Sequence, residues 1–336
     1  MSFFTPRLPA IRVRRSSLSR LLLASLFVLL GTACANPDSP PSEAYEEGEG
    51  VVIEDSGVPL AQRVLIGAFT YGGVWQGMAP VLDLEAELGR RLDIVHWFTN
   101  WNNEAHPEMV VTAAAAGRRP LISWQPHHVD VRDIAAGRHD EYVRGWARDL
   151  ASTGVAVYLR PFPEMNGDWV TWNGDPEGLV LAWRRMVELF REEGAHNVLW
   201  VFSPNVTDEP RVASNRMELY YPGDEYVDVL ALDGYNWGTT RPWTAWRPFE
   251  EVFASGYARV TALGPQPVWF AELASSTDGG DKASWVQSML DSTAFPRLEA
   301  IVWFDERKEA DWRMVADPRV ADAFRDGLMR ADIAAR

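Results

Sequence analysis

The chain of 336 residues contains one cysteine, Cys34, and this scarcity excludes two kinds of architecture. A single thiol can form neither an internal disulfide framework nor a cysteine-based zinc site. Basic residues are also few, because 32 lysines and arginines stand against 47 acids and give a formal net charge of −15. A surface of this sign repels phosphates and anionic lipid headgroups, so we expect no nucleic-acid partner.

The apolar run Leu21–Leu30 is too short to cross a hydrocarbon core of ~30 Å as a stable helix. It follows a basic segment and precedes small residues, which is the order found in signal peptides. Cleavage before Cys34 would free that cysteine for lipid attachment, as in bacterial lipoproteins, whereas cleavage after Ala35 would release the chain. We therefore expect residues 1–35 to direct export, with a lipid on Cys34 anchoring the protein at the cell surface.

Residues 36–61 are rich in Pro, Ser, Glu and Gly and carry a cluster of acids. Such a composition offers little apolar surface to bury and is typical of a flexible linker. The sequence therefore predicts a folded domain over residues 62–336.

Short apolar runs recur through this domain, separated by amphipathic stretches. These runs are continuous and not alternating, which is typical of parallel strands covered on both faces. The predicted strands are 64–70, 93–98, 120–124, 155–160, 198–203, 227–232, 268–272 and 300–305. Helices are expected between them, for example over 141–150, over 176–191 with Asp175 as N-cap, and over 281–290.

Eight β-then-α units favour an α/β fold with a closed (β/α)8 barrel as the single catalytic domain. The alternative is a doubly wound open sheet, which usually carries a glycine-rich phosphate loop after its first strand. Here that strand is followed by Tyr71-Gly72-Gly73-Val74-Trp75, with neither phosphate-binding motif. In a barrel, the functional residues lie at the C-terminal ends of the strands.

Two glutamates stand at the C-terminal ends of predicted strands. Glu164 follows the fourth strand, and Glu272 is the last residue of the seventh. A buried carboxylate without donors is costly, so Glu272 needs partners from other strands, such as Arg160 or Tyr235. Two carboxylates about 5–5.5 Å apart are the machinery of retaining glycoside hydrolysis. The apolar neighbours of Glu164 would raise its pKa, which suits an acid/base, and leave Glu272 as the nucleophile. Either glutamate alone could instead be a structural carboxylate or a loop acid.

Further candidates for substrate binding gather at the same predicted strand ends. Tryptophan is abundant, with 16 residues, and its flat apolar face suits stacking on sugar rings, although each ring could equally be core. The candidates are Trp97, Trp124, His127, Arg160, Trp169, Trp172, Asn205, Tyr235, Trp237 and Trp303. His127 and His128 lack the acidic and histidine partners of a metal motif, so we expect no metal and interpret them as loop histidines near a sugar site.

The segments around these residues resemble glycoside hydrolase family 26 over roughly residues 62–330. The resemblance is carried by EMNGDWVTW from Glu164, LDGYNWG from Leu232, VWFAELASS from Val268 and IVWFDE from Ile301. It implies a retaining (β/α)8 enzyme typified by endo-β-1,4-mannanases, with Glu164 as acid/base and Glu272 as nucleophile. It also implies that Tyr235 hydrogen-bonds the nucleophile and that Trp303 lies under the sugar at the cleavage point.

One position departs from the family pattern, because Pro163 stands where the family usually has a histidine before the acid/base. Proline has neither a donor nor a charge, so this departure bears on substrate identity. We expect a monomeric endo-β-glycanase that needs no cofactor and acts on a polysaccharide, first of all β-1,4-mannan. The alternatives are a β-1,3-1,4-glucanase or β-1,3-xylanase of the same family, a hydrolase trimming the cell's own exopolysaccharide, and a non-catalytic carbohydrate-binding barrel.

Overall fold

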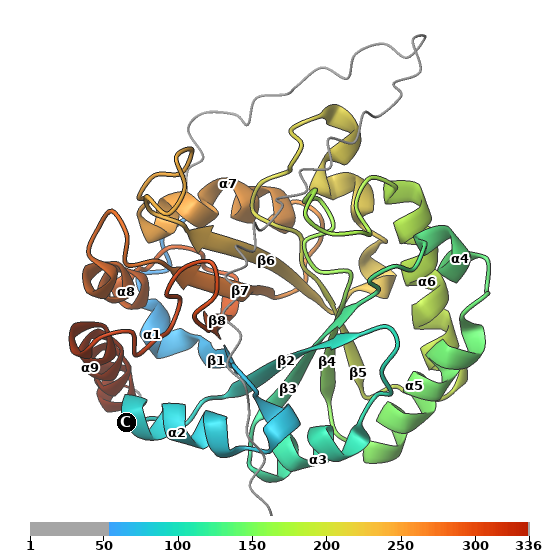
Figure 1. Cartoon of the computed structure of the whole chain (residues 1–336), viewed down its shortest axis with the longest axis horizontal. Coiled ribbons are helices and arrows are strands. Elements are labelled where there is room, and N and C mark those ends of the chain that lie inside the picture. The colour runs from blue at the N-terminus through green and yellow to red at the C-terminus, as the bar shows by residue number, and fades with distance from the viewer. Residues whose placement is uncertain (1–53, 335–336) are drawn as a thin grey trace, which may run out of the picture. The chain divides into compact units, whose positions relative to one another are not determined.

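The computed structural model describes residues 54–334, and these residues form a closed barrel of eight parallel strands. Neighbouring strands pair in chain order and β8 closes on β1, as the view of Figure 1 shows. The strands are β1 Leu65–Thr70, β2 Ile94–Asn100, β3 Arg119–Gln125, β4 Val157–Pro161, β5 Val198–Phe202, β6 Val229–Asn236, β7 Val268–Ser275 and β8 Leu298–Asp305. The predicted (β/α)8 barrel is therefore confirmed, and the open doubly wound sheet is wrong.

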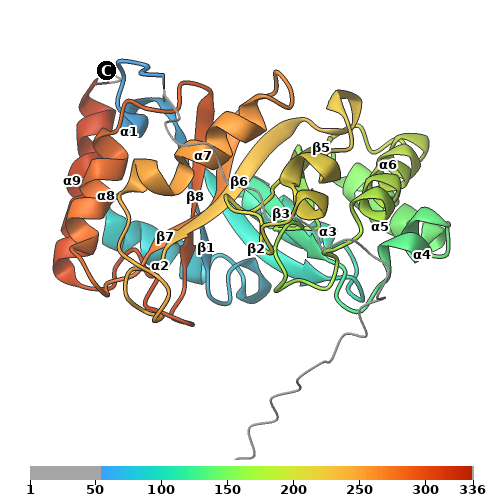
Figure 2. The ribbon, with the colours of Figure 1, turned by 90° about the horizontal axis from the view of Figure 1, so that it is seen from above.

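The helices form a layer around the strands (Figures 1 and 2). They are α1 Leu60–Arg63, α2 Ala79–Leu88, α3 Pro107–Ala115, α4 Val131–Ala135, α5 Asp140–Thr153, α6 Pro176–Glu192, α7 Phe249–Thr261, α8 Lys282–Asp291 and α9 Pro318–Ala334. Short 3-10 helices are η1 Val74–Gln76, η2 Ala213–Asn215, η3 Met217–Tyr220 and η4 Asp224–Tyr226. Within residues 54–334, none of the helices is both long and apolar enough to cross a bilayer.

Local chemistry explains where two of these helices begin. The side chain of Asp175 accepts a hydrogen bond from the backbone N–H of Gly178 at 3.0 Å, and Pro176 takes the first helical position of α6. The side chain of Asp281 likewise accepts from the backbone N–H of Ala283 at the start of α8. These caps satisfy backbone donors that the first turn of a helix leaves open.

The barrel has two separate cores because alternate residues of each strand point to opposite sides. The inner core is small and fills the barrel itself. Its members are Ile94, Leu121, Val201, Val229, Ala231, Trp269, Ala271, Ala300 and Val302. At Gly67 on β1 an added Cβ would lie 2.7 Å from the Cβ of Ile94, so this strand approaches β2 closely only because it carries a glycine.

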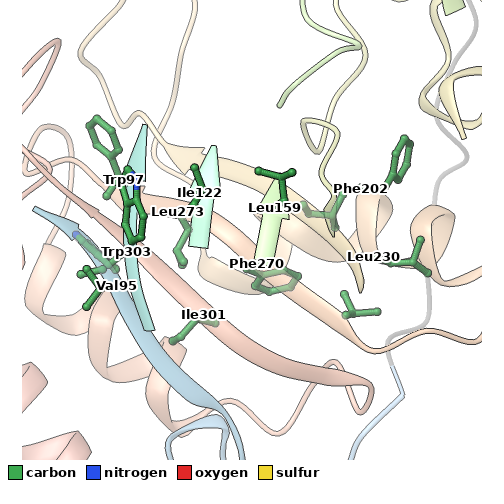
Figure 3. Packing of buried hydrophobic residues seen from close by; sticks show 14 of the residues in the cluster. Val95, Trp97, Ile122, Leu159, Phe202, Leu230, Phe270, Leu273, Ile301 and Trp303 are labelled. Atoms are coloured by element: carbon green, nitrogen blue, oxygen red, sulfur yellow. The ribbon is translucent and has the colours of Figure 1, made fainter. Parts of the chain in front are cut away.

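The larger core lies between the strands and the helices. Figure 3 shows part of it, with Trp97, Ile122, Leu159, Phe270 and Trp303 in one apolar layer. This layer holds the helices against the barrel, so the strand ends that carry the polar residues rest on a closely packed frame.

The folded domain begins before the predicted boundary at Gln62. Asp55 forms a bridge with Ala294, and Leu60 is fully buried. The end of the predicted linker therefore packs on the barrel. The predicted signal peptide and Cys34 lie outside the described residues.

Candidate active site

An irregularity in β7 directs Glu272 into the barrel mouth. The register between β6 and β7 pairs Leu232 with Phe270 and then Asp233 with Glu272, so one residue is skipped between them. Such bulges change the direction of a side chain and are common beside active sites. As a result both Ala271 and Glu272 face inward, whereas Leu273 returns to the outer core.

Two donors from other strands fix both oxygens of Glu272. The hydroxyl of Tyr235, on β6, donates to Oε1 at 2.5 Å. Nη2 of Arg160, on β4, donates to Oε2 at 2.9 Å. Glu272 as a whole is 8% exposed, so its carboxylate is held in one orientation while a small part of the residue stays open.

Arg160 lies entirely beneath the surface and joins Glu272 to a second acid. The same Nη2 donates to Oδ2 of Asp233 at 2.6 Å, and the hydroxyl of Ser203 donates to Oδ1 of Asp233 at 2.8 Å. Burial lowers the pKa of Arg160, but the charges of Asp233 and Glu272 outweigh it and raise that pKa overall. Burial also raises the pKa of Asp233 well above its usual range, although Arg160 opposes this shift. Arg160 is thus placed to position Glu272 rather than to reach a ligand.

Glu164 lies on the loop after β4 in an unusual backbone conformation. Its φ is +55°, in the left-handed region that non-glycine residues seldom adopt. The backbone N–H of Glu164 donates to the carbonyl of Ser203 at 2.9 Å, and its carbonyl accepts from Gly167 at 2.8 Å. The surrounding loop thus holds the conformation that places this side chain at the barrel mouth.

The carboxyl of Glu164 has neutral donors, in contrast to Glu272. Nδ2 of Asn205 donates to Oε1 at 2.7 Å, and Nε1 of Trp169 donates to Oε2 at 2.8 Å. Burial raises the pKa of Glu164, and the charge of Glu272 raises it further, against the lowering effect of the two donors and of Arg160. The two carboxyls therefore interact electrostatically, and Glu164 is the one whose protonated form is favoured.

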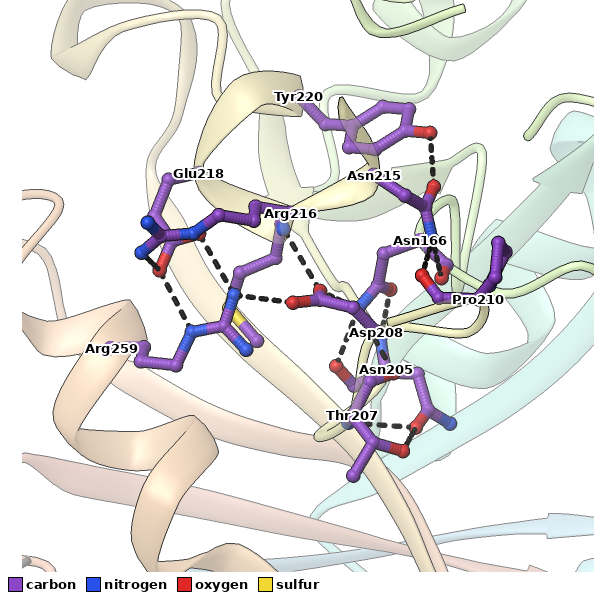
Figure 4. A network of polar contacts seen from close by, with 11 residues as sticks. Asn166, Asn205, Thr207, Asp208, Pro210, Asn215, Arg216, Glu218, Tyr220 and Arg259 are labelled. Atoms are coloured by element: carbon purple, nitrogen blue, oxygen red, sulfur yellow. Dashed lines mark hydrogen bonds and ion pairs between the residues drawn. The ribbon is translucent and has the colours of Figure 1, made fainter. Parts of the chain in front are cut away.

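A buried polar network fixes Asn205 (Figure 4). Oδ1 of Asn166 accepts from the backbone N–H of Asn205 at 2.7 Å, and Nδ2 donates to the carbonyl of Asn205 at 3.0 Å. Nδ2 of Asn166 also donates to Asp208 at 2.8 Å, and Asp208 in turn pairs with Arg259 at 2.7 Å. Asn166 therefore binds the backbone of Asn205 as a neighbouring strand would, and this orients the amide that contacts Glu164.

Aromatic rings line the wall beside Glu272. Tyr235 lies 6.1 Å from Phe304 and 5.1 Å from Trp312 between ring centroids. Trp237 is partly buried and meets Trp312 edge to face at 5.0 Å. This wall contains the predicted residues Tyr235 and Trp237, together with two rings that were not predicted.

Of the predicted site residues, Arg160, Trp169, Asn205 and Tyr235 contact one of the two glutamates. Trp169 is 51% exposed, which leaves much of its ring accessible.

Four predicted tryptophans do not reach the site. Trp97, Trp124, Trp172 and Trp303 are between 0% and 2% exposed. Trp124 stacks on Trp146 of α5 at 4.1 Å, and Trp303 meets Phe324 of α9 edge to face at 5.0 Å. Trp124 and Trp303 face the helices, and all four rings are too deeply buried to offer a surface to a sugar in this conformation.

Trp172 and His127 lie behind the loop that carries Glu164. Nε1 of Trp172 donates to the carbonyl of Pro163 at 2.8 Å, and the His127 ring lies 5.1 Å from the Trp172 ring. Burial lowers the pKa of His127, and His128 lowers it further. Both residues support the loop from outside the mouth, so Pro163 contributes a carbonyl to its packing where the family has a histidine.

Several residues at the site were missed by sequence reasoning. Asp233, Asn166 and Phe304 stand inside the quoted motifs, and Ser203 ends a predicted strand. A charge within the apolar run of β6 was a usable signal for Asp233. Pairing of Asn166 with the backbone of Asn205 depends on a loop conformation and carries no sequence signal. Across residues 54–334 there is no cluster of three or more His, Cys, Asp or Glu side chains that could hold a metal.

Two carboxyls with unlike donors, at the ends of β4 and β7 of a (β/α)8 barrel, form the kind of arrangement that retaining glycoside hydrolysis uses. Residues 124–286 match the sequence profile described as Glycosyl hydrolase family 26. This match confirms the resemblance to that family drawn from the sequence.

Individual relatives carry different names. Over 273 residues the chain is 36% identical to Endoglucanase H of Acetivibrio thermocellus, a match that covers 76% of this chain and 30% of that protein. Over 172 residues it is 30% identical to mannan endo-1,4-beta-mannosidase A and B of Caldalkalibacillus mannanilyticus, covering 47% of this chain and 30% of that protein. The chain thus spans less than a third of the length of either relative.

The fold is shared with solved structures. The catalytic domain of a Bacillus sp. endo-beta-1,4-mannanase superposes with a TM-score of 0.61 at 18% identity, covering 85% of this chain and 94% of that one. At this level of identity the likeness concerns the fold alone.

Proposed function

We propose that this chain is an endo-acting glycosidase that cleaves β-glycosidic bonds within a polysaccharide with retention of configuration. The observation that carries the proposal is the difference between the two carboxyls. Glu272 is bound by the charged Arg160 and by Tyr235, whereas Glu164 has only neutral donors and a raised pKa. A nucleophile and an acid need environments that differ in this way.

The reaction proceeds in two displacements. In the first, Oε of Glu272 forms a bond to the anomeric carbon while the glycosidic C–O bond breaks, and Glu164 gives its proton to the departing oxygen. In the second, the carboxylate of Glu164 takes a proton from water, the water oxygen bonds to the anomeric carbon, and the bond to Glu272 breaks. Both carboxyls end the cycle in the protonation state in which they began.

The first substrate we propose is β-1,4-mannan, which is named in the description of relatives such as the enzyme of Caldalkalibacillus mannanilyticus. A β-glucan is the second, and two observations favour it. The match to a protein named Endoglucanase H is longer and more identical, and Pro163 departs from the histidine usual in the family.

The test is incubation of the purified protein with mannan, with mixed-linkage β-1,3-1,4-glucan and with β-1,3-xylan, followed by measurement of new reducing ends. The anomer first released, read by NMR, should have the β configuration. Release of the α anomer would contradict the double displacement. Binding to a polymer without any release would favour the non-catalytic barrel.

Glu164→Ala separates the acid role from other losses of activity. The polysaccharide needs a proton on its leaving oxygen, whereas an aryl glycoside with an acidic phenol does not. We expect the variant to lose much less kcat/KM on the aryl glycoside than on the polymer. Equal losses on both substrates would contradict the assignment of Glu164 as the acid.

A further inference from the structure

A hollow lies at the C-terminal end of the barrel strands, between the loop after β1 and the start of α3. Its volume is about 380 Å³, within the range of ~300–1,000 Å³ for small-molecule sites. It is lined by Val74, Trp75, Gly77, His106, Glu108, Met109 and Thr112. None of these residues takes part in the chemistry assigned to Glu164 and Glu272.

Trp75 stands in this cavity wall as an exposed but anchored ring. It is 43% exposed, although a tryptophan gains by burial. Its Nε1 donates to the carbonyl of Phe98 at 3.2 Å, and its ring meets the His106 ring edge to face at 5.0 Å. The ring is therefore held in place without being covered, and its apolar face can receive a ligand at little cost in conformational entropy.

Hydrogen-bonding groups stand beside this ring. His106 has φ +53°, and its Nδ1 lies 2.8 Å from Oε1 of Glu108. This hydrogen bond lowers the pKa of Glu108, so its carboxylate is an acceptor for hydroxyl groups. An aromatic face next to a carboxylate and an imidazole combines stacking with hydrogen bonding, which suits a polyhydroxylated ring.

The cavity is joined to the catalytic wall by a short series of rings. Phe98, whose carbonyl holds Trp75, lies 6.2 Å from Phe304. Phe304 lies 6.1 Å from Tyr235, which donates to Glu272. Both features stand at the C-terminal ends of strands, where β1 pairs with β2 on one side and with β8 on the other.

We infer that this cavity is a distal subsite, in which Trp75 stacks on a sugar residue of the polysaccharide remote from the bond that is cleaved, with Glu108 and His106 bonding its hydroxyls. The inference rests on the proposed function. Binding energy from a remote sugar can be used to orient the reacting one, so the subsite would serve long substrates and not short ones.

The experiment compares two substrates in four proteins: the wild type, Trp75→Ala, Trp75→Phe and Val111→Ala. The substrates are the polysaccharide that the wild type hydrolyses and an aryl glycoside of the same sugar, which is too short to reach the cavity. We expect Trp75→Ala to lower the ratio of kcat/KM for the polymer to kcat/KM for the aryl glycoside about tenfold. Trp75→Phe keeps an aromatic face and should restore most of the ratio. Val111 is exposed on α3 outside the cavity, so its variant should keep the wild-type ratio.

A direct binding measurement completes the test. Oligosaccharides of increasing length are titrated into Glu272→Ala and into Glu272→Ala/Trp75→Ala by calorimetry. The first protein should gain affinity at the length that reaches the cavity, and the second should not. An unchanged ratio, equal losses on both substrates, or equal length dependence of binding would overturn the subsite. By contrast, a wild type that binds these sugars but hydrolyses no glycan would overturn the proposed function and leave the calorimetric comparison decisive for the subsite.

Discussion

At the scale of single residues, the two glutamates differ in the charge of their donors. Glu272 accepts from a guanidinium and a phenol, whereas Glu164 accepts from an amide and an indole. A charged donor stabilises an ionised carboxylate far more than a neutral one does. The assignment of roles therefore follows from what each carboxyl touches.

Removal of the nucleophile should abolish turnover of the polysaccharide. We expect Glu272→Ala to lower kcat by roughly 10⁴-fold or more, because no other group is placed to form the bond to carbon. Added azide should enter the space left by the side chain and give a glycosyl azide of the α configuration. In Glu164→Ala, azide replaces water in the second step and should give the β product.

The anomer of the azide, determined by NMR, separates the two roles. A β-azide from Glu272→Ala would mean that the assignments are exchanged. Glu299→Ala is the matched control, because Glu299 is exposed on β8 and should keep wild-type turnover.

Loss of one donor to Glu164 should shift the pH profile in a defined direction. The hydrogen bond from Asn205 lowers the pKa of Glu164, so Asn205→Ala should raise that pKa. The acid form then persists to higher pH, and the alkaline limb of kcat/KM should move upward. Trp169→Phe removes the other donor and should move the limb in the same direction.

The measurement is kcat/KM for the polysaccharide as a function of pH in the wild type and both variants. Asn205→Asp adds a second negative charge next to Glu164 and should move the limb further upward. A limb that stays in place or moves to lower pH in Asn205→Ala would contradict the acid role.

At this scale the sequence predicted much of the site but not its shape. The sequence predicted four of the site residues, Glu164, Glu272, Tyr235 and Asn205. Polar side chains at the ends of apolar strands cost free energy to bury unless they have a partner or a function. The partnership of Asn166 with the backbone of Asn205 could not be found, because it depends on how two loops meet.

At the scale of elements, the continuous apolar runs predicted all eight strands because a parallel strand covered on both faces has no polar side. The same property hid the orientation of the aromatic residues. On β8, Val302 belongs to the inner core and Trp303 to the outer one, so a tryptophan near the rim still packs against α9. Because side chains alternate along a strand, an inward-facing Val302 would have predicted that Trp303 points outward and Phe304 inward. The bulge that directs Glu272 inward leaves no such trace in the sequence.

Arg160 connects strands β4, β6 and β7, so its loss should destabilise the barrel. Arg160→Met leaves the buried carboxylates of Asp233 and Glu272 without their cation, which should lower the free energy of unfolding by about 3–5 kcal/mol at pH 7. The pKa of Asp233 is already raised, and it should rise further in the variant. A carboxyl with a raised pKa destabilises the fold only when it is ionised, so the loss should shrink as the pH falls.

Urea denaturation at pH 7 and at lower pH gives both quantities. Arg132→Met is the control, because Arg132 forms a half-exposed pair with Asp175, so its loss should cost much less than the loss of Arg160. If Arg160→Met cost no more than this control, Arg160 would not be the electrostatic link between the strands.

At the scale of the whole molecule, the chain combines an acidic barrel with a basic, apolar N-terminal segment. Five arginines and no acid precede Asp38, so cleavage of that segment would leave the folded domain more acidic than the full chain. An acidic surface disfavours contact with anionic lipids, and a covalent lipid would therefore be the means of attachment. We propose that export and lipid attachment at Cys34 place the barrel at the cell surface, where a polymer too large to enter the cell can reach it.

Replacement of the single cysteine tests this proposed location without altering the barrel. Cys34→Ser should prevent lipid attachment and move glycanase activity from the membrane fraction to the soluble exported fraction. A labelled fatty acid should enter the wild type and not the variant, while kcat on a soluble glycan should be equal in both, because Cys34 lies outside the residues that form the site. If the wild type took up no label and left the cell in soluble form, cleavage after Ala35 would be the correct alternative. Equal kcat in the wild type and in Cys34→Ser would then show that the anchoring proposal was wrong and that the catalytic proposal was untouched.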